Sequence, residues 1–431
     1  GGRAGAMPPE DAGDPVPLDV QGAEILAPMV RASTLALRTA CLGYGADLVF
    51  GEEIIDRKII GAVRVPSAAF GTVDYVSPRE RVAVFTTRPE EKRKLIFQLG
   101  TADPALAAEA ALTVCGDVRG VDVNMGCPKS FSVKGGMGAA LLDRPEVASE
   151  ILKSLRRSLP SSCSVTCKIR MLASTDKTRD FMAVCAASGA EAITVHMRTR
   201  DERPADPAHW DEIVRLWDAA PVPIVANGDF FTRRQIDEFW KHCAAAAPAE
   251  PSREGAAQRQ GPAGVMIARG ALWNPAIFCR GGAAPPPFEQ VVRDFAREAV
   301  RANSTYQNTK WVLNQILAGG TGAVAPSSFA GTPVKIFNRQ VGAAKSMGAI
   351  CELLGVPFCA GDWPAQAHTT AYYRAGGPGA RAFDEAQAES APANAEADAH
   401  PAMAGKRLAD GAPGAGPDAD GGAGKRLRTE G

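Results

Sequence analysis

The chain has 431 residues, 45% of them hydrophobic, and its 48 basic residues balance its 48 acidic ones. This length allows one large and one smaller folded region, and the zero net charge excludes nucleic-acid binding driven by overall charge, so any such site must be a local patch. Ten cysteines without a Cys-x-x-Cys pair, and five histidines that do not cluster with them, argue against a metal site and a disulfide framework and indicate a reducing compartment. No stretch is long and apolar enough to cross a membrane, and the N-terminus lacks a signal-peptide pattern.

Three segments have a low-complexity composition. Residues 1–19 are expected to form a disordered leader, and residues 244–262 are expected to be a surface insertion. Residues 375–431 form a third such segment, a tail that holds too few apolar residues to order itself. Folded structure is therefore expected between the leader and this tail.

Eight short apolar runs alternate with helical patterns in the first part of the chain. Short apolar strands separated by helices predict βαβ units and a parallel sheet, and eight units over roughly 250 residues fit a (β/α)₈ TIM barrel, which we place at residues 20–285. An open doubly wound sheet is the alternative, because counting strands does not establish closure. The predicted strands are Ile25–Val30, Leu48–Gly51, Leu95–Gly100, Val121–Asn124, Val165–Arg170, Ala192–Met197, Pro223–Asn227 and Gly264–Ala268. Helices are predicted at Leu35–Tyr44, Ala105–Cys115, Pro145–Ser158, Phe181–Ser188 and Thr232–Lys241.

After Phe288 the apolar pattern becomes purely helical. Its spacing predicts helices at Glu289–Asn303, Thr309–Leu317 and Pro333–Leu354. We interpret residues 286–365 as a separate small helical domain.

Polar residues stand where the predicted strands end, which is where a TIM barrel carries its chemistry. Their convergence on one barrel mouth indicates a bound ligand. Turns at Gly228 and Gly270, with the charge of Arg269, suit a phosphate. The ligand is then either a phosphorylated planar cofactor such as FMN or a phosphorylated substrate without a cofactor. The strand-end residues are Gln98, Asn124, Lys168, Arg170, His196, Asn227 and Arg269.

One cysteine follows the fourth predicted strand. Cys127 lies between Gly126 and Pro128, which hold it on a tight turn at the barrel mouth. No histidine lies nearby in sequence to activate the thiol as a nucleophile, so a neutral thiol acting as an acid is at least an equal candidate. The stretch Lys134–Gly138 predicts a mobile loop that admits a bulky substrate. A small buried cysteine is the alternative interpretation.

Several ordered blocks resemble the dihydrouridine synthase family, and within it the eukaryotic branch that modifies nucleotide 20 of the tRNA D-loop. The resemblance covers about residues 25–355. The blocks are Ala27-Pro28-Met29-Val30, Val123-Asn124-Met125-Gly126-Cys127-Pro128-Lys129, Cys167-Lys168-Ile169-Arg170, Val195-His196-Met197-Arg198, Ala226-Asn227-Gly228 and Ala268-Arg269-Gly270.

The resemblance implies an FMN-binding barrel that uses NADPH as reductant. In such enzymes the reduced flavin gives hydride to C6 of a flipped-out uracil, and a cysteine protonates C5. Carried over by position, Cys127 is that general acid. The implied cofactor-binding residues are Pro28, Met29, Val30, Gln98, Asn124, Lys168, His196, Asn227, Gly228, Asp229, Ala268 and Arg269.

Binding of tRNA is expected at local basic residues. Three arginines recur every four residues along one predicted helix face, although an ordinary solvated face is the alternative because acidic residues stand close by. The predicted RNA-contacting residues are Lys129, Arg198, Arg293, Arg297, Arg301 and Lys310.

The chain departs from the family pattern at two strand ends and in its tail. Asp229 stands where the family usually has Gly, and its side chain is expected to turn away or to cap the following helix. Met197 replaces another common Gly, so a different turn is expected before Arg198. Where animal members carry a double-stranded-RNA-binding domain, this sequence has the low-complexity tail, so tRNA binding is expected from the barrel and helical domain alone or from a domain missing in this sequence.

Two other functions remain open from sequence. One is a flavin barrel that acts on a free pyrimidine, and the other is a non-catalytic RNA-binding barrel. We expect a monomer without metal or membrane contact, located in the cytoplasm. Lys406-Arg407 and Lys425-Arg426-Leu427-Arg428 in the tail leave open an additional nuclear location.

Overall fold

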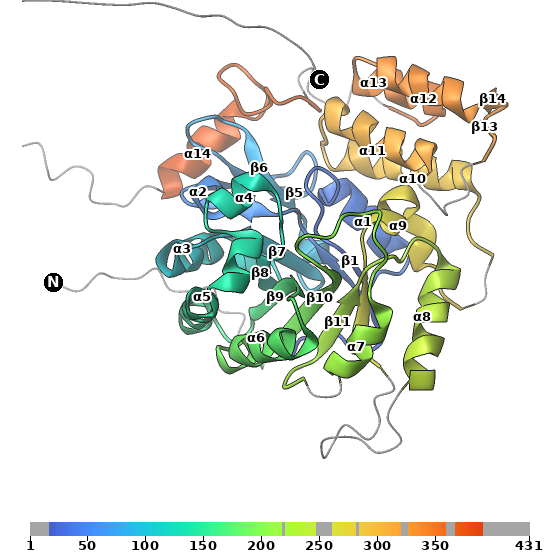
Figure 1. Cartoon of the computed structure of the whole chain (residues 1–431). Helices are drawn as coiled ribbons and strands as arrows, with labels where there is room; N and C mark the ends of the chain where they lie inside the picture. Colours follow the sequence, from blue (N-terminus) through green and yellow to red (C-terminus); the bar gives the residue numbers. More distant parts are fainter. Residues whose placement is uncertain are drawn as a thin grey trace, which may run out of the picture. The chain divides into compact units, whose positions relative to one another are not determined.

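The computed structural model describes residues 17–217, 220–246, 261–281, 284–319, 326–358 and 367–390. Eight parallel strands form a closed barrel in its centre (Figure 1). Neighbouring strands follow the order β2-β1-β12-β11-β10-β9-β8-β7, and β2 pairs with β7 through Val49↔Leu95 and Phe50↔Ile96. This last pairing closes the sheet, so the predicted TIM barrel is confirmed and the open sheet is excluded. The strands are β1 Ala23–Leu26, β2 Leu48–Phe50, β7 Leu95–Gly100, β8 Gly120–Met125, β9 Ser164–Met171, β10 Ala192–Thr199, β11 Ile224–Asn227 and β12 Gly264–Ile267.

The barrel strands are buried on both faces, which explains their continuous apolar runs. Helices surround them, and some of these helices begin with a side-chain cap. Asp103 accepts hydrogen bonds from Ala105 N and Leu106 N, and Ser174 accepts one from Lys177 N. The Ser174 cap starts its helix six residues before the predicted Phe181. The surrounding helices are α1 Leu35–Gly43, α3 Pro104–Val114, α5 Pro145–Ser158, α6 Thr175–Ala187, α7 Trp210–Trp217 and α8 Arg233–Ala246.

A three-stranded antiparallel sheet between β2 and β7 was not predicted. It comprises β4 Val63–Ser67, β5 Thr72–Val76 and β6 Ala83–Thr87, after the short β3 Ile54–Ile55 and α2 Asp56–Ile59. In β4, buried and exposed residues alternate, as expected for a sheet with one covered face.

Residues 367–390 cover this small sheet. The helix α14 Ala380–Ser390 lies against β4, Phe383 is fully buried, and the Arg81 guanidinium stands 4.4 Å from its ring centroid. The Tyr373 hydroxyl donates to the buried Asp74 carboxylate. The prediction that order ends at residue 375 is therefore wrong for residues 375–390, because a few aromatic side chains find a sheet face to cover. Residues 391–431, with both predicted nuclear-signal clusters, lie outside the described residues.

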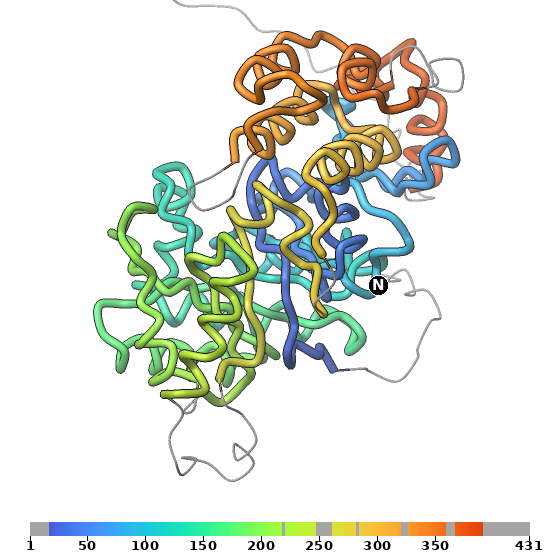
Figure 2. Tube along the Cα trace, turned by 90° about the vertical axis from the view of Figure 1, so that its right-hand side faces the viewer, coloured from blue at the N-terminus to red at the C-terminus, as the bar shows by residue number. Residues whose placement is uncertain are grey.

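A group of helices follows the barrel. The single helix predicted at Pro333–Leu354 forms two helices instead. The break occurs because Ser346 Oγ accepts a hydrogen bond from Ala349 N at 3.1 Å and caps the start of a second helix. These helices share one hydrophobic core with the barrel, so the described part of region 286–365 is continuous with it in packing. Figure 2 shows them grouped on one side of the molecule. They are α10 Phe288–Arg301, α11 Tyr306–Ala318, α12 Val334–Ala343 and α13 Met347–Leu354, with a hairpin of β13 Ser328–Phe329 and β14 Thr332–Pro333.

Two sequence expectations concern regions that the structure only partly describes. The expected leader is described from residue 17, and of the expected insertion only residues up to Ala246 and from Gly261 are described. Among the described helices, none has both the length and the apolar character that crossing a membrane requires.

Candidate active site

A pocket of about 290 Å³ lies at the carboxyl ends of the barrel strands. It gathers residues from every part of the barrel sequence, as the strand-end argument predicted. Its lining residues are Ala27, Pro28, Val30, Glu53, Gln98, Asn124, Gly126, Cys127, Pro128, Lys168, Arg170, His196, Arg198, Arg203, Pro204, Asn227, Ala268 and Arg269.

A buried polar network forms the floor beside β7, β8 and β9. Asp122 accepts from Gln98 Nε2 at 2.9 Å and from Thr166 Oγ1 at 2.8 Å. Gln98 Oε1 in turn accepts from Asn124 Nδ2 at 3.3 Å. Burial raises the pKa of Asp122 to about 6, against the effect of these hydrogen bonds and of the Lys168 charge. The network locks the orientation of the Gln98 amide at the pocket wall.

The turn that carries Cys127 is held from both sides. Asn124 Oδ1 accepts from Gly126 N at 2.9 Å and from Cys127 N at 3.0 Å, and Arg170 Nε donates to Gly126 O at 3.0 Å. Gly138, at φ +59°, lies so close that a Cβ there would stand 2.6 Å from Cys127 O, so only glycine fits. Asn124 therefore positions the thiol through the backbone.

The Cys127 thiol is half-buried and faces the pocket. Burial raises the pKa of this thiol, while the Lys129 backbone N–H acts in the opposite direction. At neutral pH the thiol is consequently protonated, which is the state a proton donor needs.

Lys168 and His196 project from neighbouring strands into the same pocket. Burial lowers the pKa of Lys168 to about 8, the Arg170 charge acts the same way, and Asp122 opposes it. Burial and then the charges of Lys168, Arg170 and Arg198 lower the pKa of His196 far below its ordinary value. The site thus combines a cationic lysine with a neutral imidazole, which serves only as a hydrogen-bonding group.

The far end of the pocket carries an ion-paired group of arginines. Asp229 accepts from Arg198 Nη2 at 2.6 and 2.7 Å and from Arg269 Nη2 at 3.4 Å, and also from Ala208 N at 2.7 Å. Asp229, at φ +57°, is absent from the pocket lining, which agrees with the expectation that its side chain turns away. Its carboxylate orients two arginines. The alternative that it caps the following helix was wrong, because its partner Arg198 comes from β10.

Met197, the other departure at a strand end, and Gly228, a predicted cofactor-binding residue, both lie outside the pocket lining. Met197 is fully buried inside β10, which continues without a turn to Thr199. Gly228 does not line the pocket, and its carbonyl accepts from Trp210 Nε1 at 3.2 Å. A Cβ at Gly228 would stand 2.8 Å from Ala208 Cβ, so glycine is needed there for packing.

The remaining predicted residues lie outside the pocket lining. Met29 packs against the core, Lys129 is exposed just before α4 Ser130–Lys134, and Lys310 Nζ donates to the carbonyls of Gly342 and Ala344. The three arginines of α10 pair within their own helix, at Arg293–Glu289, Arg297–Asp294 and Arg301–Glu298. Their predicted contact with RNA stays a prediction.

Three charged lining residues were absent from the predicted catalytic, cofactor-binding and RNA-contacting residues. Glu53 follows β2, Arg170 lies near the end of β9 and Arg203 lies after β10. Arg170 was recognised as a strand-end residue in the sequence but was given no role. Neither Glu53 nor Arg203 has a local sequence signal.

Among the described residues, no group of three or more His, Cys, Asp or Glu side chains can hold a metal ion.

The fold and the pocket define a TIM barrel with a strand-end binding site, and comparison with known proteins specifies it further. Residues 25–318 match the family described as Dihydrouridine synthase (Dus). This chain belongs to the dihydrouridine synthase family.

Several curated relatives are similar to this chain. A tRNA-dihydrouridine(20) synthase of Schizosaccharomyces pombe is 37% identical over 68% of this chain and 59% of that protein, so the chain spans less than two thirds of this relative. A protein of the same name from Saccharomyces cerevisiae is 36% identical over 69% of this chain and 78% of its own length. Among solved structures, DHODH in complex with ferulenol from Eimeria tenella aligns over 60% of this chain and 78% of that chain, with 11% identity and a TM-score of 0.38, a likeness too low to carry an argument.

Proposed function

We propose that this protein is a tRNA-dihydrouridine synthase that reduces the C5–C6 bond of uridine in the tRNA D-loop, at position 20, with bound FMN and with NADPH as reductant. The observation that carries the proposal is the meeting of Cys127, Lys168 and His196 in one pocket of a barrel of this family. The two yeast relatives, whose names specify position 20 and NAD(P)+, support the choice of substrate and reductant.

The donor set of the pocket fits FMN. A flat ring system with an anionic end needs a cation near the ring, neutral hydrogen-bonding groups at its edge and a positive far end. Lys168 supplies the cation near the ring, and Gln98 and His196 supply the neutral hydrogen-bonding groups. Arg269 supplies the positive charge at the end where barrels commonly hold phosphate. When bound, FMN supplies the hydride for the uracil ring.

The chain's own residues perform the proton chemistry. Asn124 holds the Cys127 turn so that the thiol faces the pocket, and the thiol gives its proton to C5 of the uracil while its S–H bond breaks. The proton comes from this positioned thiol rather than from water, which a substrate seated in the pocket displaces. Lys168 stabilises negative charge that develops near it.

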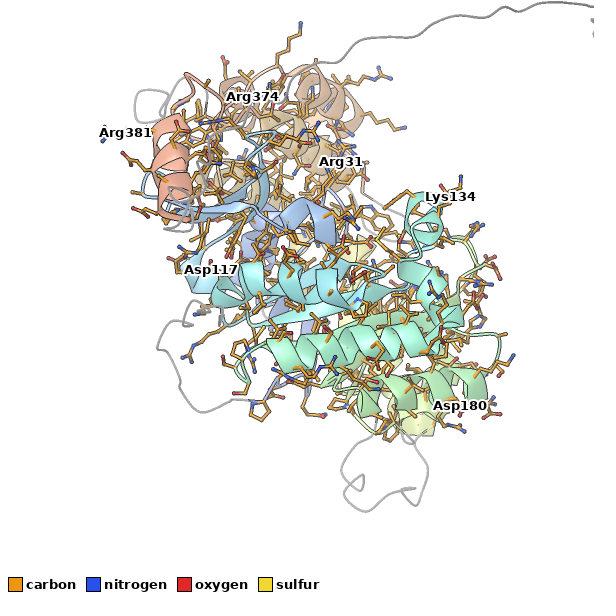
Figure 3. All side chains as sticks on the ribbon, turned by 90° about the vertical axis from the view of Figure 1, so that its left-hand side faces the viewer. Arg31, Asp117, Lys134, Asp180, Arg374 and Arg381 are labelled. Carbon is orange, nitrogen blue, oxygen red and sulfur yellow. The ribbon has the colours of Figure 1, made fainter. Side chains whose placement is uncertain are left out.

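The pocket rim favours an RNA substrate over a free pyrimidine. Beside Cys127, the helix α4 exposes Phe131 at 54% and Val133 at 41%, next to the exposed Lys129 and Lys134. Aromatic faces stack on bases and lysines pair with phosphates, whereas a small free base needs neither. Figure 3 shows Lys134 projecting from the molecular surface. We accordingly propose this rim as the tRNA contact, in a monomer working in the cytoplasm.

The test is Cys127→Ala in a single-turnover assay of dihydrouridine formation in unmodified tRNA. We expect the rate to fall by about 10²–10⁴-fold, the range for a positioned general acid. Cys279→Ala, which removes another half-buried thiol outside the pocket, is the matched control and should keep the wild-type rate. A wild-type rate in Cys127→Ala would assign the proton to another group. A protein that stays colourless after addition of FMN would overturn the flavin assignment.

A further inference from the structure

The loop after β1 holds an arginine in a strained backbone conformation at the pocket mouth. Arg31 has φ +69°, in the left-handed region that favours glycine. It directly follows Val30, which lines the pocket and is 57% exposed. Glu52 Oε2 accepts from Arg31 N at 2.6 Å and so anchors the backbone. Strain of this kind persists only where the surroundings impose it, and it is common at functional sites.

The Arg31 side chain rests on an aromatic ring of the helices that follow the barrel. Its guanidinium carbon stands 4.9 Å from the ring centroid of Trp311 on α11. The same loop is tied to this helix by Asn308 Nδ2, which donates to Thr34 Oγ1 at 3.4 Å. Figure 3 shows Arg31 where the barrel meets these helices. Stacking fixes the plane of a guanidinium and leaves the N–H groups at its edge available.

The charge of Arg31 is exposed and, within the described part of the chain, belongs to no ion pair. Arg31 differs in this from Arg297 and Arg301 of α10, which pair with carboxylates of their own helix. The neighbouring Glu52 carboxylate accepts from the Arg31 backbone rather than from its guanidinium. An exposed and oriented guanidinium suits a phosphate, which it can bind with two parallel hydrogen bonds.

Arg31 lies across the pocket mouth from the rim at α4. Arg31 follows β1 and α4 follows β8, and around the barrel these strands are separated by β2 and β7 on one side and by β9 to β12 on the other. A nucleotide whose base enters the pocket keeps its flanking phosphates outside. The RNA strand therefore crosses the mouth, where cations at both edges can hold it. Lys129 and Lys134 supply one edge, and Arg31 supplies the other.

We propose that Arg31, stacked on Trp311 at the pocket mouth, binds the backbone phosphate next to the uridine whose base enters the pocket. This deepens the proposed function, on which it rests for the RNA substrate. The contact holds the strand at the mouth, so it contributes to tRNA binding and leaves the chemical step to the residues inside the pocket.

The test measures binding of an unmodified tRNA transcript to the FMN-loaded protein over a series of KCl concentrations. Arg31→Gln should weaken binding roughly three- to tenfold and reduce the salt slope by about one, because one phosphate contact is lost. Arg31→Lys keeps the charge and should keep the slope, although it loses the planar stack. In single-turnover assays, Arg31→Gln should raise the tRNA concentration that gives half the maximal rate and leave the maximal rate within about twofold.

A transcript with one uncharged methylphosphonate linkage locates the phosphate. We place the neutral linkage directly before or directly after the reactive uridine. At one of these two positions it should weaken binding by the wild type and leave binding by Arg31→Gln unchanged, because the arginine and the phosphate form a single contact. The proposal is overturned if the neutral linkage weakens both proteins equally at both positions.

Arg215→Gln is the matched control. Arg215 is an exposed arginine paired with Glu212 in the last turn of α7, at the end of the barrel opposite the mouth, so this variant should keep the wild-type affinity and slope. Thermal unfolding separates a phosphate contact from a clamp between the loop and α11. A lowered Tm in Arg31→Gln together with a wild-type salt slope would show that the stack only supports the fold, and would overturn the proposal.

Binding and turnover can fail separately. If the wild type formed no dihydrouridine but bound tRNA with a salt slope that depends on Arg31, the proposed function would fail and the contact of Arg31 with RNA would stand. If the wild type formed dihydrouridine and Arg31→Gln kept its affinity and slope, the contact would fail and the proposed function would stand.

Discussion

Two groups of basic residues in this protein differ in what their side chains face: one group lines a pocket, and the other pairs with acidic residues of its own helix. Lys168 and Arg170 on β9 meet Arg269, which follows β12 about 100 positions later, in one pocket. Arg297 and Arg301 on α10 stand four residues apart and pair with acidic residues three positions before them. Both groups look equally like binding residues in the sequence.

The difference follows from how each element places its side chains. On a helix, positions three or four apart are neighbours, so alternating charges satisfy one another along the same face. Barrel strands bring their carboxyl ends to a common mouth, so cations from different strands face one space and need a ligand or a distant partner. A charge pattern within one helix is therefore a weak sign of binding, and strand-end polar residues are a strong one.

The largest effect in this comparison is expected for Lys168→Ala. The loss of a charged contact of about 1.5–3 kcal/mol should weaken FMN binding by about 10- to 150-fold. Calorimetric titration of the apoprotein with FMN measures it, and Lys153→Ala, at an exposed lysine paired with Glu150 on α5, is the control. Equal affinities in the two variants would remove Lys168 from the cofactor site.

The pH dependence of FMN binding should follow the same lysine. Burial holds the pKa of Lys168 at about 8, and its charged form is the one that attracts an anionic ligand. Affinity should therefore be constant below this value and fall as pH rises through it, by about tenfold per pH unit. In Lys168→Arg the fall should disappear from this range, because the guanidinium stays charged. A decline that persists in Lys168→Arg would point to another titrating group.

The smallest effect concerns tRNA binding, where two matched pairs of charges can be reversed. Replacing Lys129 and Lys134 with Glu should weaken tRNA binding roughly tenfold and reduce the salt slope by about two, since each lysine neutralises a phosphate. Replacing Arg297 and Arg301 with Glu should change the affinity by about twofold or less, because their charges are already paired. The opposite order of effects would restore α10 as the RNA surface.

The sequence by itself determined the barrel and most of its site. Continuous apolar runs predicted all eight barrel strands, because strands buried on both faces must be apolar throughout. Cys127, Lys168 and His196 were found because barrel topology carries strand ends to one place. These inferences depend only on local pattern and on a general property of the fold.

Tertiary structure alone decided the features that depend on partners remote in sequence. Asp229 pairs with Arg198 across 31 positions, and Glu53 lines the same pocket as Cys127 from another strand end. The helix α14 is ordered because Phe383 packs on the face of a sheet more than 290 positions earlier in the chain. Tyr373 makes a hydrogen bond to Asp74 of the same sheet, across 299 positions. No local spacing encodes such contacts, since burial and ion pairing depend on which surfaces the folded chain brings together.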